Sequence, residues 1–227
     1  YLDGKVERRL ATELAGRDEH LLHDTLSHVG FRRSHGIIYA PICHDCDACL
    51  AVRTVVEKFR PSASQRRVQN INDDITIIET AAIATHEQYI LFSKYQESRH
   101  TGGDMATMDF VDYKGLIEET PVKTIVLEYR NVYGMLIGVC LVDQLGDGLS
   151  AVYSFFDPQD KKKSLGTYII LTLVDLARQR GLPHLYLGYW VSGSKKMAYK
   201  DKFQPLEYYD GREWAPINLL RDNPAWI

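Results

Sequence analysis

Residues 149–205 read LSAVYSFFDPQDKKKSLGTYIILTLVDLARQRGLPHLYLGYWVSGSKKMAYKDKFQP, and this stretch decides the fold. Residues 152–156 are almost entirely apolar and aromatic, which predicts a strand. Apolar residues then recur at helical spacing from Ser164, the expected N-cap, to a stop at Gly181. Residues 185–190 form the next predicted strand. Two strands joined by one helix are normally parallel, so we expect an anion-attracting helix N-terminus beside a strand end.

The composition limits the classes of protein that the chain can belong to. Its 227 residues allow one large domain or two small ones, and a hydrophobic content of 45% supports a real core. The net charge of −3 argues against a generally basic nucleic-acid binder, so any such contact must be a local patch. No apolar run approaches the ~20 residues of a membrane span. With no signal peptide visible and three of four cysteines crowded together, the expected location is the cytoplasm.

The chain is predicted to divide into a smaller N-terminal subdomain at 1–80, which carries the cysteine cluster, and a larger domain at 81–227. Segment 60–67 is interpreted as a breaker followed by a basic turn. Outside the opening stretch, we expect helices at 22–30, 86–100 and 109–119, strands at 51–56, 75–78, 124–129 and 135–141, and a hairpin turn at 131–134. The buried face of the helix at 86–100 is predicted to consist of Tyr89, Ile90, Phe92 and Tyr95.

The second half therefore runs helix, helix, strand, strand, strand, helix, strand, an order that resembles the core of GNAT acyltransferases. The predicted fold class is mixed α/β (α+β), with a GNAT-like acyltransferase core and the smaller cysteine-containing subdomain. In that fold a splayed pair of parallel strands faces the acyl donor, whose phosphates lie on a glycine-rich loop at the helix N-terminus. Here residues 163–168 keep one glycine, Gly166, and lack the second small residue. An acyl-CoA-dependent N-acyltransferase is therefore an alternative with weak support from the sequence.

Short motifs spread over nearly the whole chain narrow the choice of family. They are Tyr1-Leu2, Gly30-Phe31-Arg32-Arg33-Ser34, Tyr39-x-Pro41-x-Cys43, Ser64-Gln65-Arg66-Arg67, Tyr95-Gln96 with Arg99-His100, Tyr153-x-Phe155-Phe156-Asp157-Pro158, Ser164-Leu165-Gly166-Thr167-Tyr168, Tyr186-Leu187-Gly188-Tyr189 and Lys196-Met197-Ala198-Tyr199-Lys200. Together they resemble the motifs of bacterial aspartate/glutamate leucyltransferases and their eukaryotic relatives, the arginyl-tRNA–protein transferases. The resemblance implies transfer of an amino acid from charged tRNA to the N-terminus of an acidic protein, which marks that protein for degradation.

The same resemblance suggests which amino acid is transferred. A short chain with a C-x-x-C-x-x-C cluster favours leucine, from leucyl-tRNA, and leaves arginine as the alternative. A non-enzymatic, zinc-ribbon-like RNA- or protein-binding module is a third hypothesis, against which the long second-half core argues. A transfer assay would separate these three alternatives.

Formation of a peptide bond from an aminoacyl ester is downhill, so the enzyme mainly has to hold an amine against a carbonyl. A free α-amino group has a pKa near ~7.7–8.0, so a strong general base is not required. The site does need a pocket for an acidic side chain and a donor for the developing oxyanion. Tyr153 is a candidate oxyanion donor, Asp157 a candidate proton acceptor and Tyr199 a third catalytic candidate. The plain alternatives are a core tyrosine and an aspartate that caps a turn.

Basic residues are the candidates for binding the two substrates. Those assigned to substrate binding are Arg32, Arg33, Arg99, His100, Lys196 and Lys200. Those assigned to tRNA binding are Arg66, Arg67, Lys161, Lys162, Lys163, Gly166 and Lys195. Bidentate arginine suits a carboxylate, and lysines interleaved with Tyr199 suit phosphate contact and base stacking. The alternatives are a solvated lysine-rich loop and, for Arg99 and His100, a favourable interaction with a helix C-terminus.

Cys43, Cys46 and Cys49 form a C-x-x-C-x-x-C cluster whose spacing suits thiolates on one metal or cluster. Three ligands are one short, and His44 is a candidate for the fourth. In the resembled family a cysteine lies just before the equivalent of Tyr1, where this sequence begins. A zinc or iron–sulfur site and free thiols are both open alternatives, and the transfer chemistry itself requires no cofactor.

Overall fold

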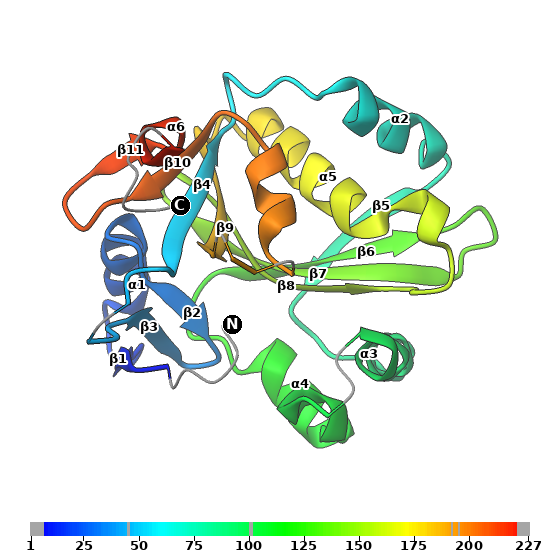
Figure 1. The fold of residues 1–227 in the computed structure, drawn as a ribbon. Coiled ribbons are helices and arrows are strands. Elements are labelled where there is room, and N and C mark those ends of the chain that lie inside the picture. The colour runs from blue at the N-terminus through cyan, green and yellow to red at the C-terminus, as the bar shows by residue number, and fades with distance from the viewer. Residues whose placement is uncertain (1–6, 45, 100–101, 192, 195, 222–227) are drawn as a thin grey trace.

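The computed structural model describes residues 7–44, 46–99, 102–191, 193–194 and 196–221, and its centre is an eight-stranded sheet (Figure 1). The strands lie in the order β11-β10-β4-β9-β8-β7-β6-β5. Their bounds are β4 (Leu50–Val55), β5 (Thr76–Ala81), β6 (Thr124–Arg130), β7 (Leu136–Leu145), β8 (Gly148–Phe156), β9 (His184–Trp190), β10 (Leu206–Tyr209) and β11 (Trp214–Pro216). Within the described chain, β8 and β9 are the one parallel pair of this sheet. The predicted parallel crossover is thereby confirmed.

Helices cover both faces of the sheet, and each face has its own hydrophobic core (Figure 1). One face carries α5 (Leu165–Gln179), which is flanked by α2 (Ala63–Ile71). The other carries α3 (His86–Arg99) and α4 (Phe110–Glu118). Three 3-10 turns and one short helix complete the set: η1 (Asp104–Thr107), η2 (Lys161–Lys163), η3 (Ala198–Lys202) and α6 (Asn218–Arg221). The predicted mixed α/β class and the order of elements in the second half are confirmed.

A small antiparallel sheet and one helix form the N-terminal part of the molecule. The sheet has the order β1-β3-β2, with bounds β1 (Arg9–Glu13), β2 (Arg32–Ser34) and β3 (Ile37–Pro41), and α1 (Glu19–His28) packs beside it. Arg33 of β2 fastens this part to the large sheet, because its guanidinium donates two hydrogen bonds to Asp143 of β7, at 2.6 and 2.8 Å. The anchored strand brings its neighbour, Arg32, onto β8.

The helix of the opening stretch begins and ends where the sequence predicts, with one difference in its cap. Gly181 has a φ of +68°, the left-handed conformation expected just beyond a helix C-terminus. Ser164 occupies the N-cap position, but its side chain makes no capping hydrogen bond. The reason is its left-handed backbone, with a φ of 49°, which departs from the extended conformation typical of an N-cap.

The prediction of a basic turn at 65–67 is wrong, because these residues lie in α2. The side chain of Ser62 accepts a hydrogen bond from Gln65 N–H at 3.3 Å, and Gln65 Oε1 accepts one from Ser62 N–H at 2.8 Å. This reciprocal capping box starts the helix directly after Pro61. Residues 62–64 of the predicted breaker are therefore the N-cap and the first two residues of α2.

The predicted buried face of α3 is partly wrong. Phe92 is buried, but Ile90 is 68% exposed, and two glutamines take buried positions. Gln88 donates to Glu128 at 2.8 Å and Gln96 to the Tyr153 hydroxyl at 2.6 Å. Because buried polar groups are stable only with such partners, these contacts allow glutamine at positions that periodicity reserves for apolar residues.

The proposed division of the chain at residues 80 and 81 stays a proposal. Strands β4 and β5 precede that boundary, yet both belong to the large sheet. Among the described residues, no helix combines the length and the apolar composition that a membrane crossing requires.

Candidate active site

The candidate site lies where the parallel strands β8 and β9 part. The two strands pair at three positions, from Gly148 opposite His184 to Ser150 opposite Tyr186. The register between β7 and β8 shifts just beyond this point, at Leu141/Val142, so β8 carries an extra residue there. Such a bulge bends a strand and increases its twist, which separates β8 from β9. We call the space between the two strands beyond this paired region the parting. It begins at Ala151 on β8, directly after the last paired residue, Ser150.

The guanidinium of Arg32 lies in this parting. It donates to the carbonyl oxygen of Ala151 on β8 at 2.7 Å and to the hydroxyl of Ser150 at 3.2 Å. On the β9 side it packs on Gly188, where a Cβ atom would stand 3.0 Å from the guanidinium nitrogen Nη2. Gly188 has a φ of +80°, so both its backbone and its missing side chain make room for Arg32. A positive charge is thus placed inside the sheet.

Lys200 of η3 reaches the next residue of β9. Its ammonium or amine nitrogen donates to the carbonyl oxygen of Tyr189 at 2.5 Å, and the residue is 8% exposed. Burial, and then the charge of Arg32, lower the pKa of Lys200 from 10.5 to about 7. Among the described residues, no carboxylate forms an ion pair with Lys200. A neutral amine at this position is therefore accessible near pH 7.

Tyr199, the neighbour of Lys200 on η3, is 41% exposed as a residue, and its hydroxyl lies close enough to Arg32 to respond to that charge. Burial raises the pKa of the hydroxyl to about 12, and the neighbouring Tyr95 and Cys140 act in the same direction. Arg32 opposes them by lowering that pKa. The Tyr199 hydroxyl therefore stays protonated and is able to donate a hydrogen bond beside Arg32.

Tyr153 lies on β8 two residues beyond Ala151, in a tyrosine–glutamine pair. Its hydroxyl accepts a hydrogen bond from Gln96 Nε2 at 2.6 Å, and burial raises its pKa to about 12. The Oε1 atom of Gln96 and the indole nitrogen of Trp190 are buried without a hydrogen-bond partner in the described part of the chain. Unpaired buried polar atoms are costly, so both are candidates for contact with a bound substrate.

Asp157 and Arg99 lie around the end of β8. The carboxylate of Asp157 pairs with Lys94 at 3.0 Å and accepts a hydrogen bond from Gln159 N–H at 2.9 Å, so it caps the turn after the strand. Arg99 is exposed at the end of α3, with its guanidinium carbon 5.9 Å from the centre of the Phe156 ring. Both residues border the parting, and Asp157 already serves a structural role there.

Arg33 points away from the parting. Its side chain is 1% exposed and forms a two-point ion pair with Asp143, which is itself fully buried. Its third partner is the carbonyl oxygen of His35 at 2.8 Å. Arg33 and Arg32 are both predicted from the sequence to bind substrate, but their side chains lie on opposite faces of β2. We leave Arg33 out of the proposed binding set.

Most of the residues assigned to tRNA binding are connected by α2. At one end of this helix, Gln65 Nε2 donates to the carbonyl oxygen of Lys202 in η3 at 2.9 Å. At the other end, Asn72 Nδ2 donates to the carbonyl oxygen of Lys163 in η2 at 2.7 Å. Arg66 and Arg67 are exposed on the helix between these two contacts. The basic surface formed by Arg66, Arg67, Lys161, Lys162 and Lys163 is thus held together on the α5 side of the sheet, with Lys161 and Lys162 exposed.

The structure describes Lys196 and Gly166, but not the other two remaining basic candidates, His100 and Lys195. Lys196 is exposed in the loop before η3, whereas His100 and Lys195 lie outside the described residues, as do Tyr1 and Leu2 of the motifs. At Gly166 a Cβ atom would stand 3.0 Å from the ring of Phe156. Gly166 therefore allows the start of α5 to pack closely on the end of β8, whatever else it binds.

The cysteine cluster lies between β3 and β4, and Cys49 directly precedes Leu50, which pairs with Trp190 of β9. Burial raises the pKa of the Cys49 thiol, and the negative charges of Glu7, Cys46 and Cys43 raise it further. Cys46 and Cys49 line a pocket of about 380 Å³. Over the described ranges, no three cysteine, histidine or acidic side chains are arranged to hold a metal ion. The predicted zinc or iron–sulfur site is therefore not confirmed among these residues, and no step of the chemistry is assigned to a metal.

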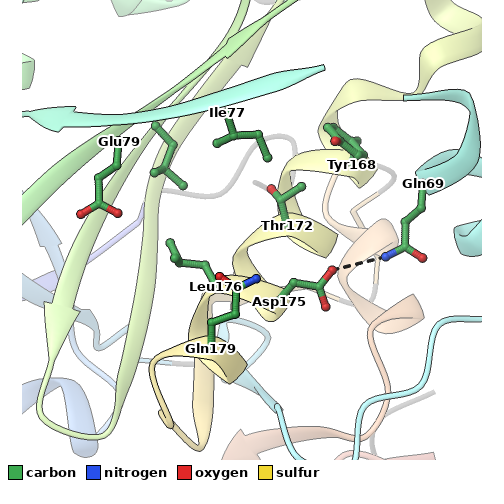
Figure 2. A pocket seen from close by; sticks show the side chains of 9 residues that line it. Gln69, Ile77, Glu79, Tyr168, Thr172, Asp175, Leu176 and Gln179 are labelled. Atoms are coloured by element: carbon green, nitrogen blue, oxygen red, sulfur yellow. Dashed lines mark hydrogen bonds between the residues drawn. The ribbon is translucent and has the colours of Figure 1, made fainter. Parts of the chain in front are cut away.

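A separate pocket of about 430 Å³ opens between α2, α5 and the edge strand β5 (Figure 2). Its lining residues are Gln69, Ile77, Glu79, Leu127, Tyr168, Thr172, Asp175, Leu176 and Gln179. The carboxylates in it are already engaged, Glu79 by Arg180 and Asp175 by Arg178 and Gln69. None of the predicted site residues lines this pocket, so it is distinct from the parting.

Sequence reasoning missed three contributors to the parting: Gln96, Trp190 and the carbonyl oxygen of Tyr189. Gln96 and Tyr189 stand inside motifs that were recognised, but their roles depend on which strands lie side by side. For Gln96 one signal was present in the sequence: helical spacing places this glutamine on the face of α3 that packs against the sheet.

Comparisons with known proteins identify the family. Residues 87–210 match the family model described as arginine-tRNA-protein transferase, C terminus, and residues 1–67 match the model of its N terminus. The chain belongs to this family. It is 49% identical to an aspartate/glutamate leucyltransferase of Granulibacter bethesdensis, over 96% of this chain and 81% of the relative. It is 48% identical to one of Paramagnetospirillum magneticum, over 94% of this chain and 88% of that relative. The protein is therefore a member of a transferase family.

Solved structures support the fold. The chain is similar to L-PGS from Bacillus licheniformis, with a TM-score of 0.56 and 12% identity over 89% of this chain and 68% of that one. It is also similar to FemX, with a TM-score of 0.53 and 9% identity over 87% of this chain and 68% of that one. At such low identity the likeness concerns the fold alone.

Proposed function

We propose that this protein is an aspartate/glutamate leucyltransferase, which moves leucine from leucyl-tRNA to the N-terminal aspartate or glutamate of a protein. The observation that carries the proposal is the identity of 46–49% to relatives of that name, over nearly the whole chain. Family membership implies an aminoacyl-tRNA donor and a protein acceptor. The choice of leucine over arginine rests on the names of these relatives.

The geometry at the parting of β8 and β9 suits aminoacyl transfer. The hydroxyls of Tyr153 and Tyr199 are protonated over the whole physiological range, since both pKa values are raised to about 12. Two protonated O–H donors of this kind are suited to the oxyanion that develops when an amine attacks an ester. Arg32 supplies the positive charge that an acidic acceptor side chain requires, and Arg99 supplies a second charge at the rim.

The basic surface along α2 and η2 suits the acceptor stem of tRNA. Arg66, Arg67 and Lys161–Lys163 lie on the same side of the sheet as η3, which carries Tyr199 and Lys200. The amide of Gln65 and that of Asn72 hold the two ends of this surface in fixed register with η3 and η2. A phosphate backbone bound along α2 would bring its 3′ end toward the parting, although the protein as a whole carries a net charge of −3.

The test supplies the protein with radiolabelled leucyl-tRNA or arginyl-tRNA, together with peptides that begin with Asp, Glu or Ala. Label from leucyl-tRNA on the Asp and Glu peptides alone is the expected result. Label from arginyl-tRNA instead would overturn the assignment of leucine. Absence of label from both tRNAs, together with acylation of the peptides from an acyl-CoA, would overturn the proposal as a whole.

Variants connect the assay to the geometry. Tyr199→Phe removes one hydroxyl donor and is expected to slow transfer by roughly 10²-fold, the usual effect of losing an oxyanion donor. Arg66→Ala with Arg67→Ala is expected to raise the KM for tRNA and to weaken its salt dependence, because fewer phosphates are neutralised. Lys114→Ala on α4, on the opposite face of the sheet, is the control for loss of a positive charge.

A further inference from the structure

We propose that the side-chain amine of Lys200 is the catalytic base of the transfer, which takes a proton from the attacking α-amine and passes it to the leaving ribose oxygen. The inference rests on the proposed function and adds a catalytic role for a residue to which sequence reasoning gave only substrate binding. It starts from the position of the amine, which lies at the parting of β8 and β9.

The position of Lys200 is unusual for a lysine. Its nitrogen is held inside the fold by one hydrogen bond of 2.5 Å to the carbonyl oxygen of Tyr189, and the residue is 8% exposed. Lysines are almost never buried unless they are paired with an acid. Here the charged group that faces the amine, among the described residues, is the guanidinium of Arg32 on β2, which has the same sign. From β9 the carbonyl oxygen of Tyr189 accepts the hydrogen bond of the amine, and on η3 the neighbouring Tyr199 has a hydroxyl that also responds to the charge of Arg32.

Arg32 and Lys200 contact adjacent residues of one strand. The guanidinium packs on Gly188 and the amine binds the carbonyl of Tyr189. The two groups are close enough for the charge of Arg32 to lower the pKa of Lys200. The two positive groups repel each other, and the one that is able to lose its proton is the buried lysine. The arrangement keeps a neutral, basic nitrogen at the place where the acceptor amine must arrive.

An acidic acceptor fits this pair of groups. In an N-terminal aspartate or glutamate, the side-chain carboxylate and the α-amine belong to the same residue and lie close together. With the carboxylate near Arg32, the α-amine falls next to Lys200. The bound carboxylate also offsets the charge of Arg32, which makes Lys200 more basic only while an acidic acceptor is present. The same pair of residues would then link the choice of acceptor to the chemical step.

The proton transfers balance without any other reactant. The neutral α-amine attacks the ester carbonyl carbon of the aminoacyl group, and an N–H proton passes to the Lys200 amine as the C–N bond forms. The Lys200 ammonium then gives this proton to the ribose oxygen as the C–O bond breaks. One amine and one ester become one amide and one ribose hydroxyl, and Lys200 returns to its neutral form.

The first part of the test needs no aminoacyl-tRNA. In protein labelled with ¹³C at the lysine ε-carbons, the resonance that disappears in Lys200→Met belongs to Lys200, and its chemical shift is followed from pH 5 to 11 at steps of about one unit. Titration close to neutrality, with an upward shift of the midpoint on addition of a peptide that begins with Asp, is the expected result. A midpoint at the ordinary lysine value of about 10.4 would overturn the inference.

The second part measures single-turnover leucyl transfer to the Asp peptide. Lys200→Arg keeps a positive charge but cannot lose its proton, and we expect it to lose about 10²–10⁴-fold in rate, the usual share of a general base. Lys200→Ala is expected to regain part of its rate in ethylamine, in proportion to the neutral amine, and none in tetramethylammonium. Label is counted on the peptide only. Lys114→Arg is the matched control, and melting curves verify that each variant is folded.

The outcomes separate the inference from the function on which it rests. If the wild type transfers leucine and Lys200→Arg matches its rate, the base is another group and the inference is wrong. Rescue of Lys200→Ala by tetramethylammonium as well as by ethylamine would show that only charge is needed, and would also overturn it. If the wild type transfers leucine to no peptide, the proposed function fails, and the role of Lys200 fails with it.

Discussion

Replacement of Gly188 by alanine tests whether Arg32 really occupies the parting of β8 and β9. Two separate costs are expected. Gly188 has a φ of +80°, and a residue with a Cβ atom in this left-handed region costs about 1–2 kcal/mol. The new Cβ atom would also stand 3.0 Å from Nη2 of Arg32, so the guanidinium must move off its 2.7 Å hydrogen bond to Ala151.

The magnitude follows from adding these terms. A hydrogen bond to a charged group contributes about 1.5–3 kcal/mol, so Gly188→Ala is expected to lower the free energy of unfolding by about 2.5–5 kcal/mol. For a domain of this size, each kcal/mol shifts the melting temperature by about 2–4 °C, which gives a decrease of about 5–20 °C. Gly181→Ala is the matched control: its φ is +68°, but no atom lies within 4 Å of its Cβ position. It carries only the backbone cost, a decrease of about 2–8 °C.

The assay is differential scanning calorimetry of both variants, in the wild type and in an Arg32→Ala background. In the Arg32→Ala background, the clash is absent, so Gly188→Ala should cost no more than Gly181→Ala. Equal effects of the two glycine substitutions in the wild-type background would refute the placement of Arg32 against β9. Leucyl transfer, measured on the same samples at a temperature where all are folded, should fall in Gly188→Ala and stay near the wild-type rate in Gly181→Ala.

Two further predictions concern charge burial. Asp143→Asn leaves Arg33 buried without its carboxylate, so the free energy of unfolding, measured by urea denaturation, should fall by about 3–5 kcal/mol. The control Asp175→Asn, in an exposed pair, should lower it by less than about 1 kcal/mol. Similar losses in the two variants would contradict the buried pair. Lys200→Met is expected to raise stability near pH 7, because the folded protein disfavours a proton that the unfolded chain binds. The pKa of Lys200 is about 7 in the folded protein and 10.5 in the unfolded chain, so wild-type stability should increase between these two pH values, by up to about 1.4 kcal/mol per pH unit. The difference in stability between Lys200→Met and the wild type should shrink over the same range. A constant difference across this range would show that Lys200 is not a buried neutral amine.

Local patterns in the sequence predict the second half of the fold well, because the start and end of its elements are marked by residues within or next to each element. The helix that became α5 has an apolar face, an N-cap position at Ser164 and a stop at Gly181. The failure at α2 has a different cause. Pro61 was interpreted as the end of structure, although the Ser62-x-x-Gln65 pattern behind it is a helix start. The small N-terminal sheet could not be predicted, since its pairing depends on docking against β7, more than 100 residues away in the chain.

The candidate site was predictable as a set of residues but not as an arrangement. Motifs named Arg32, Tyr153, Tyr199 and Lys200 from the sequence. That Arg32 and Lys200 meet over adjacent residues of β9 depends on a bulge in β8, a positive φ at Gly188 and the angle at which β2 arrives. Periodicity carries none of this information, because it describes which face a residue occupies and not which strand lies opposite.

The two arginines of β2 show how the fold supports a costly site. Successive side chains of a strand point to opposite faces, so Arg32 and Arg33 cannot serve the same purpose. Arg33 is neutralised by Asp143 in a buried pair that fixes the position of β2 on the large sheet. This anchor holds Arg32 beside Lys200, an arrangement of two like charges that would otherwise relax toward water. Arg33 therefore fixes the position of the strand whose adjacent residue, Arg32, lowers the pKa of Lys200.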